Sequence, residues 1–311
     1  MTPSERDRKE EPDLTALKDM PISFPGLFGD WEFNPDPIAI HVGHGIYWYG
    51  IILAVGMLAG LMLCMKQAKR FGLTEDHVLD MVLWAVPIGV ICARAYYCIF
   101  YWELYRDDPI SVLYIWEGGL AIYGGIIGGA LTLLVVAKVK KIPATVLLDL
   151  AAMAVIIGQF CGRWGNFMNR EAHGAVTDCF LKMGLVEANG EVVYYHPTFL
   201  YESAWNLIGF IGLHIYSKRR KFDGEVFLLY MAWYGLGRAW IEGLRTDSLY
   251  LFSTGIRVSQ LLAAVFFVVS AGVIVWVRVK RRPTPETLYV NRRKQAEAEA
   301  PQPDTPESEN M

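Results

Sequence analysis

Long apolar runs separated by short polar links dominate the chain from residue 46 onward. A helix needs about 20 mostly apolar residues to cross the hydrocarbon core of a bilayer. The pattern predicts an all-α fold, a polytopic membrane protein with seven transmembrane helices. A segment near 169–196, after the fourth run, is too polar to span. The predicted spans cover roughly residues 46–65, 78–101, 119–137, 144–168, 197–217, 225–244 and 256–277.

The composition agrees with a membrane protein, since 53% of the 311 residues are hydrophobic and the mean hydropathy is +0.27. The first 35 residues lack an apolar stretch ahead of a small-residue cleavage site, so we expect no cleaved signal peptide. The five cysteines show no CxxC or zinc spacing, and four of them fall in apolar runs, as expected of small buried side chains. We predict no metal site and no cofactor. These cysteines are Cys64, Cys92, Cys98, Cys161 and Cys179.

Basic residues gather in alternate links between the predicted spans, and the opposite links lean acidic. Positive charge marks the cytoplasmic side of a membrane protein. The N-terminus is therefore predicted outside and the C-terminus in the cytoplasm. The basic links are 66–70, 138–141, 218–221 and 278–282.

This orientation divides the chain into three parts. Residues 1–36 form an acidic extracytoplasmic N-terminal tail, and residues 37–280 form the seven-helix domain with its extracytoplasmic loop near 169–196. Residues 281–311 are rich in Pro, Glu, Gln and Ala without apolar periodicity, which predicts a disordered cytoplasmic tail.

Polar side chains within the predicted spans gather at one depth. At a helical rise of 1.5 Å per residue, Arg94 and Arg163 lie roughly 25 Å above the cytoplasmic starts of their spans, and Arg238 about 20 Å. Ionisable groups inside a membrane are costly and mark functional sites. We expect a site in the outer half of the membrane that includes Tyr49, Arg94, Tyr123, Arg163, Asn166, Glu202, Arg238 and Glu242.

Residues at i, i+3 or i+4, and i+7 lie on one face of a helix. This spacing predicts a polar face on each of two spans. The two sets are Arg163, Asn166 and Arg170 on the fourth span, and Arg238, Glu242 and Arg245 on the sixth.

Two interpretations of the charges compete. Arg238 and Glu242 could form an ion pair that neutralises itself inside the bundle. Three arginines, however, outnumber the carboxylates that we expect to reach them. A guanidinium binds phosphate through two parallel hydrogen bonds, so the surplus favours a phospholipid headgroup as the partner.

The stretch GRWGNFMNREAHG, Gly162–Gly174, resembles the signature G-R-x-G-N-F-x-N-x-E-x-x-G of the bacterial prolipoprotein diacylglyceryl transferases and matches it at every fixed position. The resemblance covers roughly residues 36–280 and implies seven membrane spans with the N-terminus outside. Other stretches follow in the family's order: IYWYG at 46–50, GGLAIYGGIIGG at 118–129, HPTFLYE at 196–202 and YGLGRAWIEGLRTD at 234–247.

The resemblance implies an enzyme of the bacterial inner membrane, with its site facing the outer leaflet. It would transfer diacylglyceryl from phosphatidylglycerol to the lipobox cysteine of a prelipoprotein and release glycerol phosphate, the first step of lipoprotein maturation. Its partners would be these two substrates and the bilayer, with no nucleic acid.

The implied catalytic residues are Arg163, Arg238, Tyr123 and Asn166. In that reading the two arginines hold the phosphate, and Asn166 and Glu171 order the headgroup site. The other residues of the implied phosphatidylglycerol site are Tyr49, which lines the pocket, Arg94, and the framework or gate residues Glu202, Glu242 and Arg245.

Tyr123 stands where many family members have a histidine that is sometimes proposed as the base. An ordinary phenol, with a pKa of about 10, is a poor base at neutral pH. His196 is a candidate replacement, or equally a structural hydrogen-bonding residue before Pro197.

Three other classes of protein fit the sequence less well: a transporter, a structural scaffold and a metal-dependent lipid enzyme. A transporter needs a midplane site, usually between inverted repeats, and the sequence shows neither. A structural scaffold leaves the surplus arginines unexplained. A metal-dependent lipid enzyme needs clustered intramembrane aspartates, for which only Asp149 is available.

Overall fold

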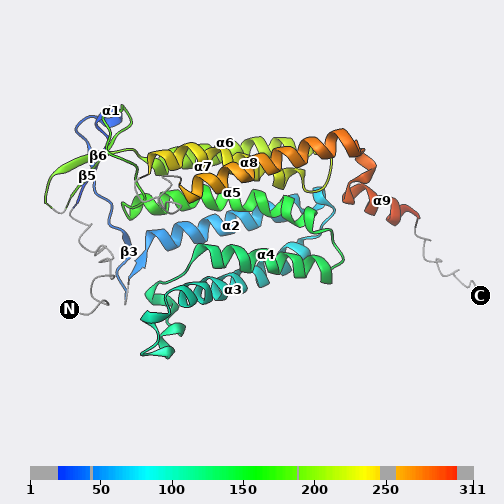
Figure 1. The fold of residues 1–311 in the computed structure, drawn as a ribbon, viewed down its shortest axis with the longest axis horizontal. Coiled ribbons are helices and arrows are strands. Elements are labelled where there is room, and N and C mark those ends of the chain that lie inside the picture. The colour runs from blue at the N-terminus through cyan, green and yellow to red at the C-terminus, as the bar shows by residue number, and fades with distance from the viewer. Residues whose placement is uncertain (1–19, 43–44, 188, 246–256, 300–311) are drawn as a thin grey trace, which may run out of the picture.

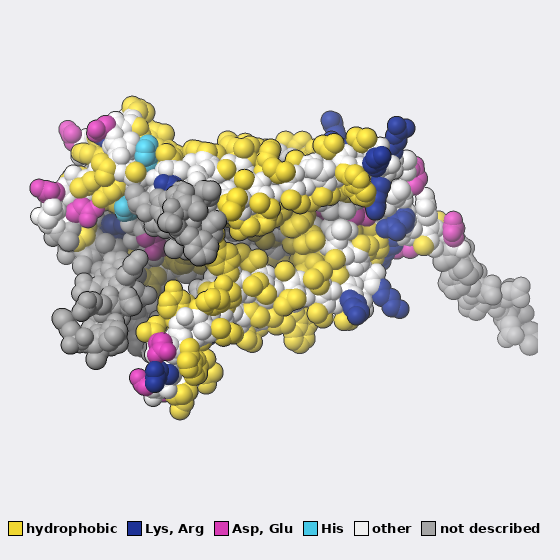
Figure 2. Space-filling model, in the orientation of Figure 1, with side chains coloured by type: hydrophobic (Ala, Val, Ile, Leu, Met, Phe, Trp, Pro, Cys, Tyr) yellow, Lys and Arg dark blue, Asp and Glu magenta, His cyan; other side chains and the backbone are white. Residues whose placement is uncertain are grey.

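The computed structural model describes residues 20–42, 45–187, 189–245 and 257–299. It is a long bundle of helices with a small β-sheet at one end and the C-terminal helix at the other (Figure 1). Hydrophobic side chains cover the middle of the face shown in Figure 2. Lys and Arg gather at the end near the C-terminal helix, so the visible surface has an apolar belt between two polar ends.

Each of the seven predicted apolar runs forms a helix, and every boundary lies within three residues of the prediction. The fourth run, 144–168, has the predicted bounds. The helices are α2 (Trp48–Ala68), α3 (Glu75–Phe100), α4 (Ile122–Val139), α5 (Ala144–Met168), α6 (Thr198–Tyr216), α7 (Glu225–Ile241) and α8 (Val258–Trp276).

Five of these helices are long and apolar enough to cross a bilayer, judged over the described ranges. They are α2, α3, α4, α5 and α8, where α2 and α8 are counted with the short helical turns that follow them. The other two are polar or short: α6 carries Glu202, Asn206 and His214 within 19 residues, and α7 has only 17 residues. The protein is therefore a mostly helical, multi-pass membrane protein.

Helix α5 lies at the centre of the bundle and packs against α2, α4, α6 and α7, while α3 packs on α4 and α8 on α7. Association of helices in lipid depends on close packing because lipid tails are as apolar as the side chains. A Cβ on Gly56 of α2 would lie 2.8 Å from the Cβ of Cys161 on α5. One on Gly124 of α4 would lie 2.3 Å from the Cys92 carbonyl oxygen on α3. Glycine at both positions permits these close approaches.

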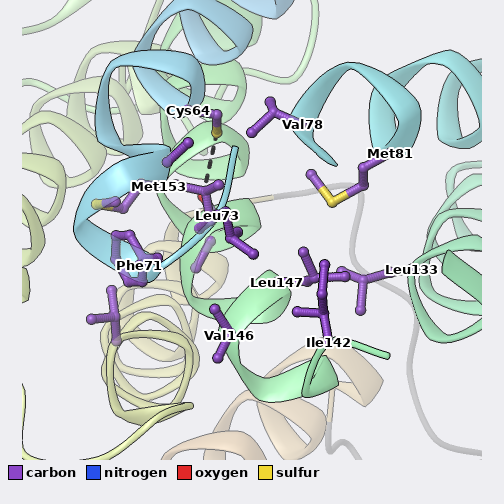
Figure 3. Packing of buried hydrophobic residues seen from close by; sticks show 14 of the residues in the cluster. Cys64, Phe71, Leu73, Val78, Met81, Leu133, Ile142, Val146, Leu147 and Met153 are labelled. Carbon is purple, nitrogen blue, oxygen red and sulfur yellow. Dashed lines mark hydrogen bonds between the residues drawn. The ribbon is translucent and has the colours of Figure 1, made fainter. Parts of the chain in front are cut away.

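The main apolar core lies where α2 ends and where α3 and α5 begin (Figure 3). Phe71, Val146 and Met153 are fully buried there, and the Cys64 thiol donates to the Leu150 carbonyl at 3.5 Å. The helices are thus packed most tightly at the end that carries the basic links.

Side-chain caps define two helix starts at this same end. Thr74 caps α3 by accepting from the backbone N–H of His77, whose ring accepts from the Thr74 N–H in return. Asp149, fully buried on α5, accepts from the backbone N–H groups of Gly224 and Phe227, at 2.8 Å each. The aspartate considered for a metal site therefore caps α7.

Two small sheets lie outside the helices and correct the all-α prediction. One has four strands in the order β2–β1–β5–β6, all antiparallel, and the other pairs β3 with β4. The strands are two to four residues long, too short for period-two alternation to be recognised in the sequence. They are β1 (Ile22–Ser23), β2 (Glu32–Phe33), β3 (Ile38–Ile40), β4 (Ile46–Tyr47), β5 (Met183–Val186) and β6 (Val192–Tyr195).

Both terminal parts contain regular structure, and at the C-terminal end this differs from the predicted disorder. Residues 22–33 form β1, the short helix α1 (Pro25–Phe28) and β2, while residues 1–19 of the predicted tail lie outside the described ranges. At the other end α9 (Tyr289–Glu299) is helical where we expected disorder. The Tyr289 N–H donates to Asp223 at 2.8 Å and the Arg293 guanidinium to the Gly72 carbonyl at 2.8 Å. These two contacts hold α9 against the bundle.

Candidate functional site

A buried carboxylate joins three arginines from different parts of the chain. Glu202, in the second turn of α6, is 8% exposed. Its Oε2 lies 3.1 Å from Arg163 Nε of α5, and its Oε1 lies 3.4 Å from Arg238 Nη1 of α7. Arg245, just beyond α7, reaches Oε1 at 3.6 Å. The family resemblance implied a framework or gate role for Glu202, and in the structure it lies between the three arginines.

Glu242 adds a second carboxylate to this arginine cluster, by which we mean Arg163, Arg238 and Arg245 with Glu202 and Glu242. It is 3% exposed, and its Oε2 lies 2.8 Å from Arg238 Nη2. Its backbone carbonyl accepts a hydrogen bond from Arg257. The predicted ion pair between Arg238 and Glu242 is therefore present, but Arg238 also contacts Glu202.

The arginine cluster holds three guanidiniums and two carboxylates, so its formal charge is positive. The side chains of Arg163 and Arg238 remain 25% and 20% exposed. Charges in a site that excludes most water interact more strongly than in bulk solvent. An anionic group entering beside these two arginines would be attracted.

The signature loop extends this network beyond the arginines. Arg163 Nη1 donates to Asn166 Oδ1 at 3.2 Å, and Asn166 Nδ2 donates to Glu171 Oε1 at 2.8 Å. Asn169 donates to the same Glu171 oxygen at 3.4 Å. Glu171 therefore fixes the orientation of the Asn166 amide, which in turn holds Arg163.

The helical-face predictions hold only in part, because Arg170 and Arg245 lie beyond the ends of their helices. Helix α5 ends at Met168, and Arg170 adopts a left-handed backbone with φ 53°, so its side chain leaves the face of Arg163. Burial lowers the pKa of Arg170 from its ordinary value. Helix α7 ends at Ile241, and Arg245 reaches Glu202 from an extended backbone rather than from a helix.

Tyr49 and Tyr123 stand at the starts of α2 and α4. The Tyr49 ring lies against Gly165, where a Cβ would be 2.3 Å from Tyr49 Cδ2. The signature glycine therefore provides the space for this ring. Tyr123 is 54% exposed, and its ring centroid is 6.4 Å from that of Tyr96. Tyr234, which the sequence analysis did not single out, lies within electrostatic range of Tyr123 and Arg238, and its position one turn before Arg238 was the available signal.

Arg94 is not brought together with the other arginines. It is 6% exposed, and its guanidinium donates five hydrogen bonds of 2.8–3.3 Å to backbone carbonyls of the segment between α3 and α4. Tyr105 also packs under it, with the ring centroid 5.0 Å from Cζ. Arg94 therefore organises this segment. Its predicted depth in the membrane did not indicate the direction in which its side chain points. The acceptors are Ser111, Val112, Tyr114, Gly118 and Gly119.

His196 has a structural environment. Its backbone N–H donates to the Ala175 carbonyl at 3.0 Å, and its own carbonyl accepts from Gly174 at 2.9 Å. Its Nδ1 lies 3.3 Å from the Tyr201 hydroxyl and 3.7 Å from Cys179 Sγ. Of the two interpretations from the sequence, these bonds favour the hydrogen-bonding role. Across the described ranges, no three His, Cys, Asp or Glu side chains gather as a metal ion would need.

Comparison with known proteins places this geometry in a family. Residues 37–276 match the family model of prolipoprotein diacylglyceryl transferase. The chain belongs to this family. A phosphatidylglycerol–prolipoprotein diacylglyceryl transferase of Bacillus licheniformis is 45% identical over 257 residues, which cover 79% of this chain and 94% of that protein. One from Enterococcus faecalis is 47% identical over 264 residues, covering 81% and 92%.

The prolipoprotein diacylglyceryl transferase match covers the whole arginine cluster and the signature loop. The protein is accordingly a transferase, as the resemblance in Gly162–Gly174 implied. Residues 22–33, which contribute two strands to the four-stranded sheet, lie outside the matched region, as does α9.

Proposed function

We propose that this protein transfers the diacylglyceryl group of phosphatidylglycerol to the lipobox cysteine of a prelipoprotein. The thiol sulfur forms a bond to the terminal glyceryl carbon of the lipid, and the bond from that carbon to the phosphate oxygen breaks. The thiol loses its proton to water, and glycerol phosphate leaves with the electron pair of the broken bond. The observation that carries this proposal is the surplus of arginine around Glu202 within the family match.

The arginines supply the main catalytic effect in this proposal. Negative charge grows on the phosphate as it leaves, and fixed donors aimed at that charge lower the barrier. Arg163 and Arg238 are held in place by Glu202, at 3.1 and 3.4 Å, before the lipid arrives. Little reorganisation is then needed when the bond breaks. The partly exposed edges of the two guanidiniums are the surfaces that would meet the phosphate.

Asn166 and Glu171 order the headgroup side of the site, and Tyr49 lines it from α2. Tyr123 is placed at the start of α4 to hydrogen-bond to lipid or peptide rather than to act as the base. A thiol with an ordinary pKa of about 8.5 ionises more readily in a field of fixed cations. The arginine field and water together would then account for thiolate formation.

The same proposal includes the membrane arrangement. All seven helices α2–α8 cross the bacterial inner membrane, with residues 1–36 outside and residues 281–311 in the cytoplasm. Lys and Arg gather at the α9 end of the face shown in Figure 2, which supports this orientation. Residues 37–280 are then the catalytic domain, with the 169–196 loop outside and the arginine cluster at the level of the outer leaflet.

Transfer of label tests the proposal directly. Purified protein would be incubated with phosphatidylglycerol labelled in the diacylglyceryl group and a peptide carrying a lipobox cysteine. We expect the label to become attached to the peptide, with one glycerol phosphate released per peptide modified. The same peptide with serine in place of the cysteine is the matched control. Label on the serine peptide, or none on the cysteine peptide, would refute the proposed reaction.

A further inference from the structure

The N-terminal segment, residues 20–36, is built into the protein although it precedes the region shared with the family. Its strand β1 lies inside the four-stranded sheet, between β2 and β5. Ile22 is fully buried and pairs with Leu185, and Ser23 pairs with Gly184. A Cβ on Gly184 would lie 2.3 Å from Ser23 Oγ, so the two strands are in close contact.

Aromatic side chains of this N-terminal segment enclose the last turn of α5. The Phe33 ring stacks on Phe167 with centroids 6.1 Å apart and planes 5° apart. Phe24 lies 6.3 Å from the same ring, and Phe199 of α6 stacks on it at 4.6 Å. Phe167 is consequently only 8% exposed. It directly follows Asn166 in the signature, so its position constrains the turn that carries Asn166.

Arg170 connects the N-terminal segment to the signature loop by polar contacts. It is 9% exposed, and its Nε donates to the Met20 carbonyl at 3.0 Å. Its Nη2 donates to Asn34 Oδ1 at 3.2 Å and to the Pro35 carbonyl at 3.1 Å. These bonds hold a residue with a left-handed backbone, which is costly outside glycine and persists only where its surroundings impose it. The neighbouring residue is Glu171, which orients Asn166.

We propose that the N-terminal segment is a positioning element of the transferase site and that Arg170 is its main link to that site. The segment holds the turn after α5, the turn holds Glu171, Glu171 orients Asn166, and Asn166 holds Arg163. The inference rests on the proposed function, in which Arg163 binds the phosphate of the lipid.

A purely stabilising role for the segment predicts something different. If the strands only add stability, weakening them lowers the amount of folded protein, and the molecules that remain folded keep their full activity. If the segment positions Glu171, folded molecules lose turnover, and the loss depends on Glu171 being present. A double-mutant cycle between Arg170 and Glu171 separates the two roles, because residues acting through one network do not behave additively.

The experiment measures transfer to a lipobox peptide by the full-length chain, with the wild type first. Its activity alone tests the proposed function. Arg170→Gln should then lower kcat about tenfold, with the KM for the peptide unchanged within twofold. In a Glu171→Ala background, which removes the oxygen that accepts from Asn166, the same change should cost less than twofold. Arg170→Lys should restore part of the rate. Arg106→Gln removes an exposed guanidinium elsewhere and is the matched control, with wild-type kinetics expected.

An equal loss in both backgrounds, or no loss in either, would overturn the positioning role. Phe33→Ala provides a second variant should Arg170→Gln fail to fold, and the same dependence on Glu171 is expected of it. Amide hydrogen exchange gives a readout that does not involve catalysis. Exchange over 166–174 should quicken in both variants and stay unchanged over 109–119, and unchanged protection over 166–174 would also refute the proposal.

Discussion

Arg163 and Arg238 are the two arginines proposed to bind the phosphate, and replacing either one by lysine should preserve the charge and remove the planar guanidinium with its paired donors. Arg163 uses two nitrogens, Nε toward Glu202 and Nη1 toward Asn166, at 3.1 and 3.2 Å. A lysine has one nitrogen and retains only one of these contacts. A charge-assisted hydrogen bond contributes about 1.5–3 kcal/mol. Since the Arg163 side chain is 25% exposed, water replaces part of the lost interaction, and we take the low end of this range of free energies. It corresponds to a loss of about tenfold in rate.

Arg238 bridges two buried carboxylates, with Nη1 3.4 Å from Glu202 and Nη2 2.8 Å from Glu242. Arg238→Lys cannot serve both, so we again expect a loss of about tenfold or more. Because both arginines share Glu202, the double lysine variant should lose less than the product of the single losses.

The assay is transfer of labelled diacylglyceryl to a lipobox peptide, with kcat/KM for phosphatidylglycerol measured in detergent. Arg106→Lys, on the exposed segment between α3 and α4, should be indistinguishable from wild type. If Arg163→Lys and Arg238→Lys both retain activity within threefold of wild type, the hypothesis that the two guanidiniums bind the phosphate is wrong.

Three further results are expected. Tyr123→Phe should cost no more than about tenfold, since it removes one hydrogen bond worth roughly 0.5–1.5 kcal/mol; near-complete loss in folded protein would instead make this phenol the proton acceptor. Arg94→Gln should lower the melting temperature in detergent by several degrees, because the buried guanidinium that donates five hydrogen bonds to this segment is lost, and an unchanged melting temperature would contradict the organising role. Cysteines placed in 172–193 should react with an impermeant label in intact cells, whereas those in 218–221 should react only after the membrane is opened, and the reverse pattern would invert the topology.

The sequence predicted the positions of helices α2–α8 to within three residues, and length and apolarity mark five of them as candidate spans. Helix α5 has its predicted bounds, and its arginine lies where the family signature places it. The depth of a residue along a predicted span does not determine the direction in which its side chain points. Arg94 has a similar predicted depth to Arg163, yet it turns toward the backbone of its own loop.

The parts that the sequence missed depend on contacts between distant segments. Strand β1 has only two residues, which is too short to show an alternation of apolar and polar positions. It is a strand because it pairs with β2 on one side and with β5 on the other. The composition of α9 predicts disorder. In the structure, however, Asp223 accepts a hydrogen bond from the first residue of α9, and the Gly72 carbonyl accepts one from Arg293. Arg170 fits a helical face by spacing, but a left-handed turn redirects it toward the N-terminal segment.

The pairing of β1 with β5 also constrains the order in which the molecule assembles. Ile22 and Leu185 are partners more than 160 residues apart, and the segment between them holds α2, α3, α4 and α5, all of them long and apolar enough to span. Four crossings by these helices would return the chain to the side of the bilayer on which it began, where the two strands can meet. They cannot meet before α5 has been inserted and β5 has been synthesised. During synthesis the N-terminal segment therefore remains without its partner strand until that point. The sheet closes only late, and under the proposed positioning role the turn that carries Glu171 would be fixed in the same event.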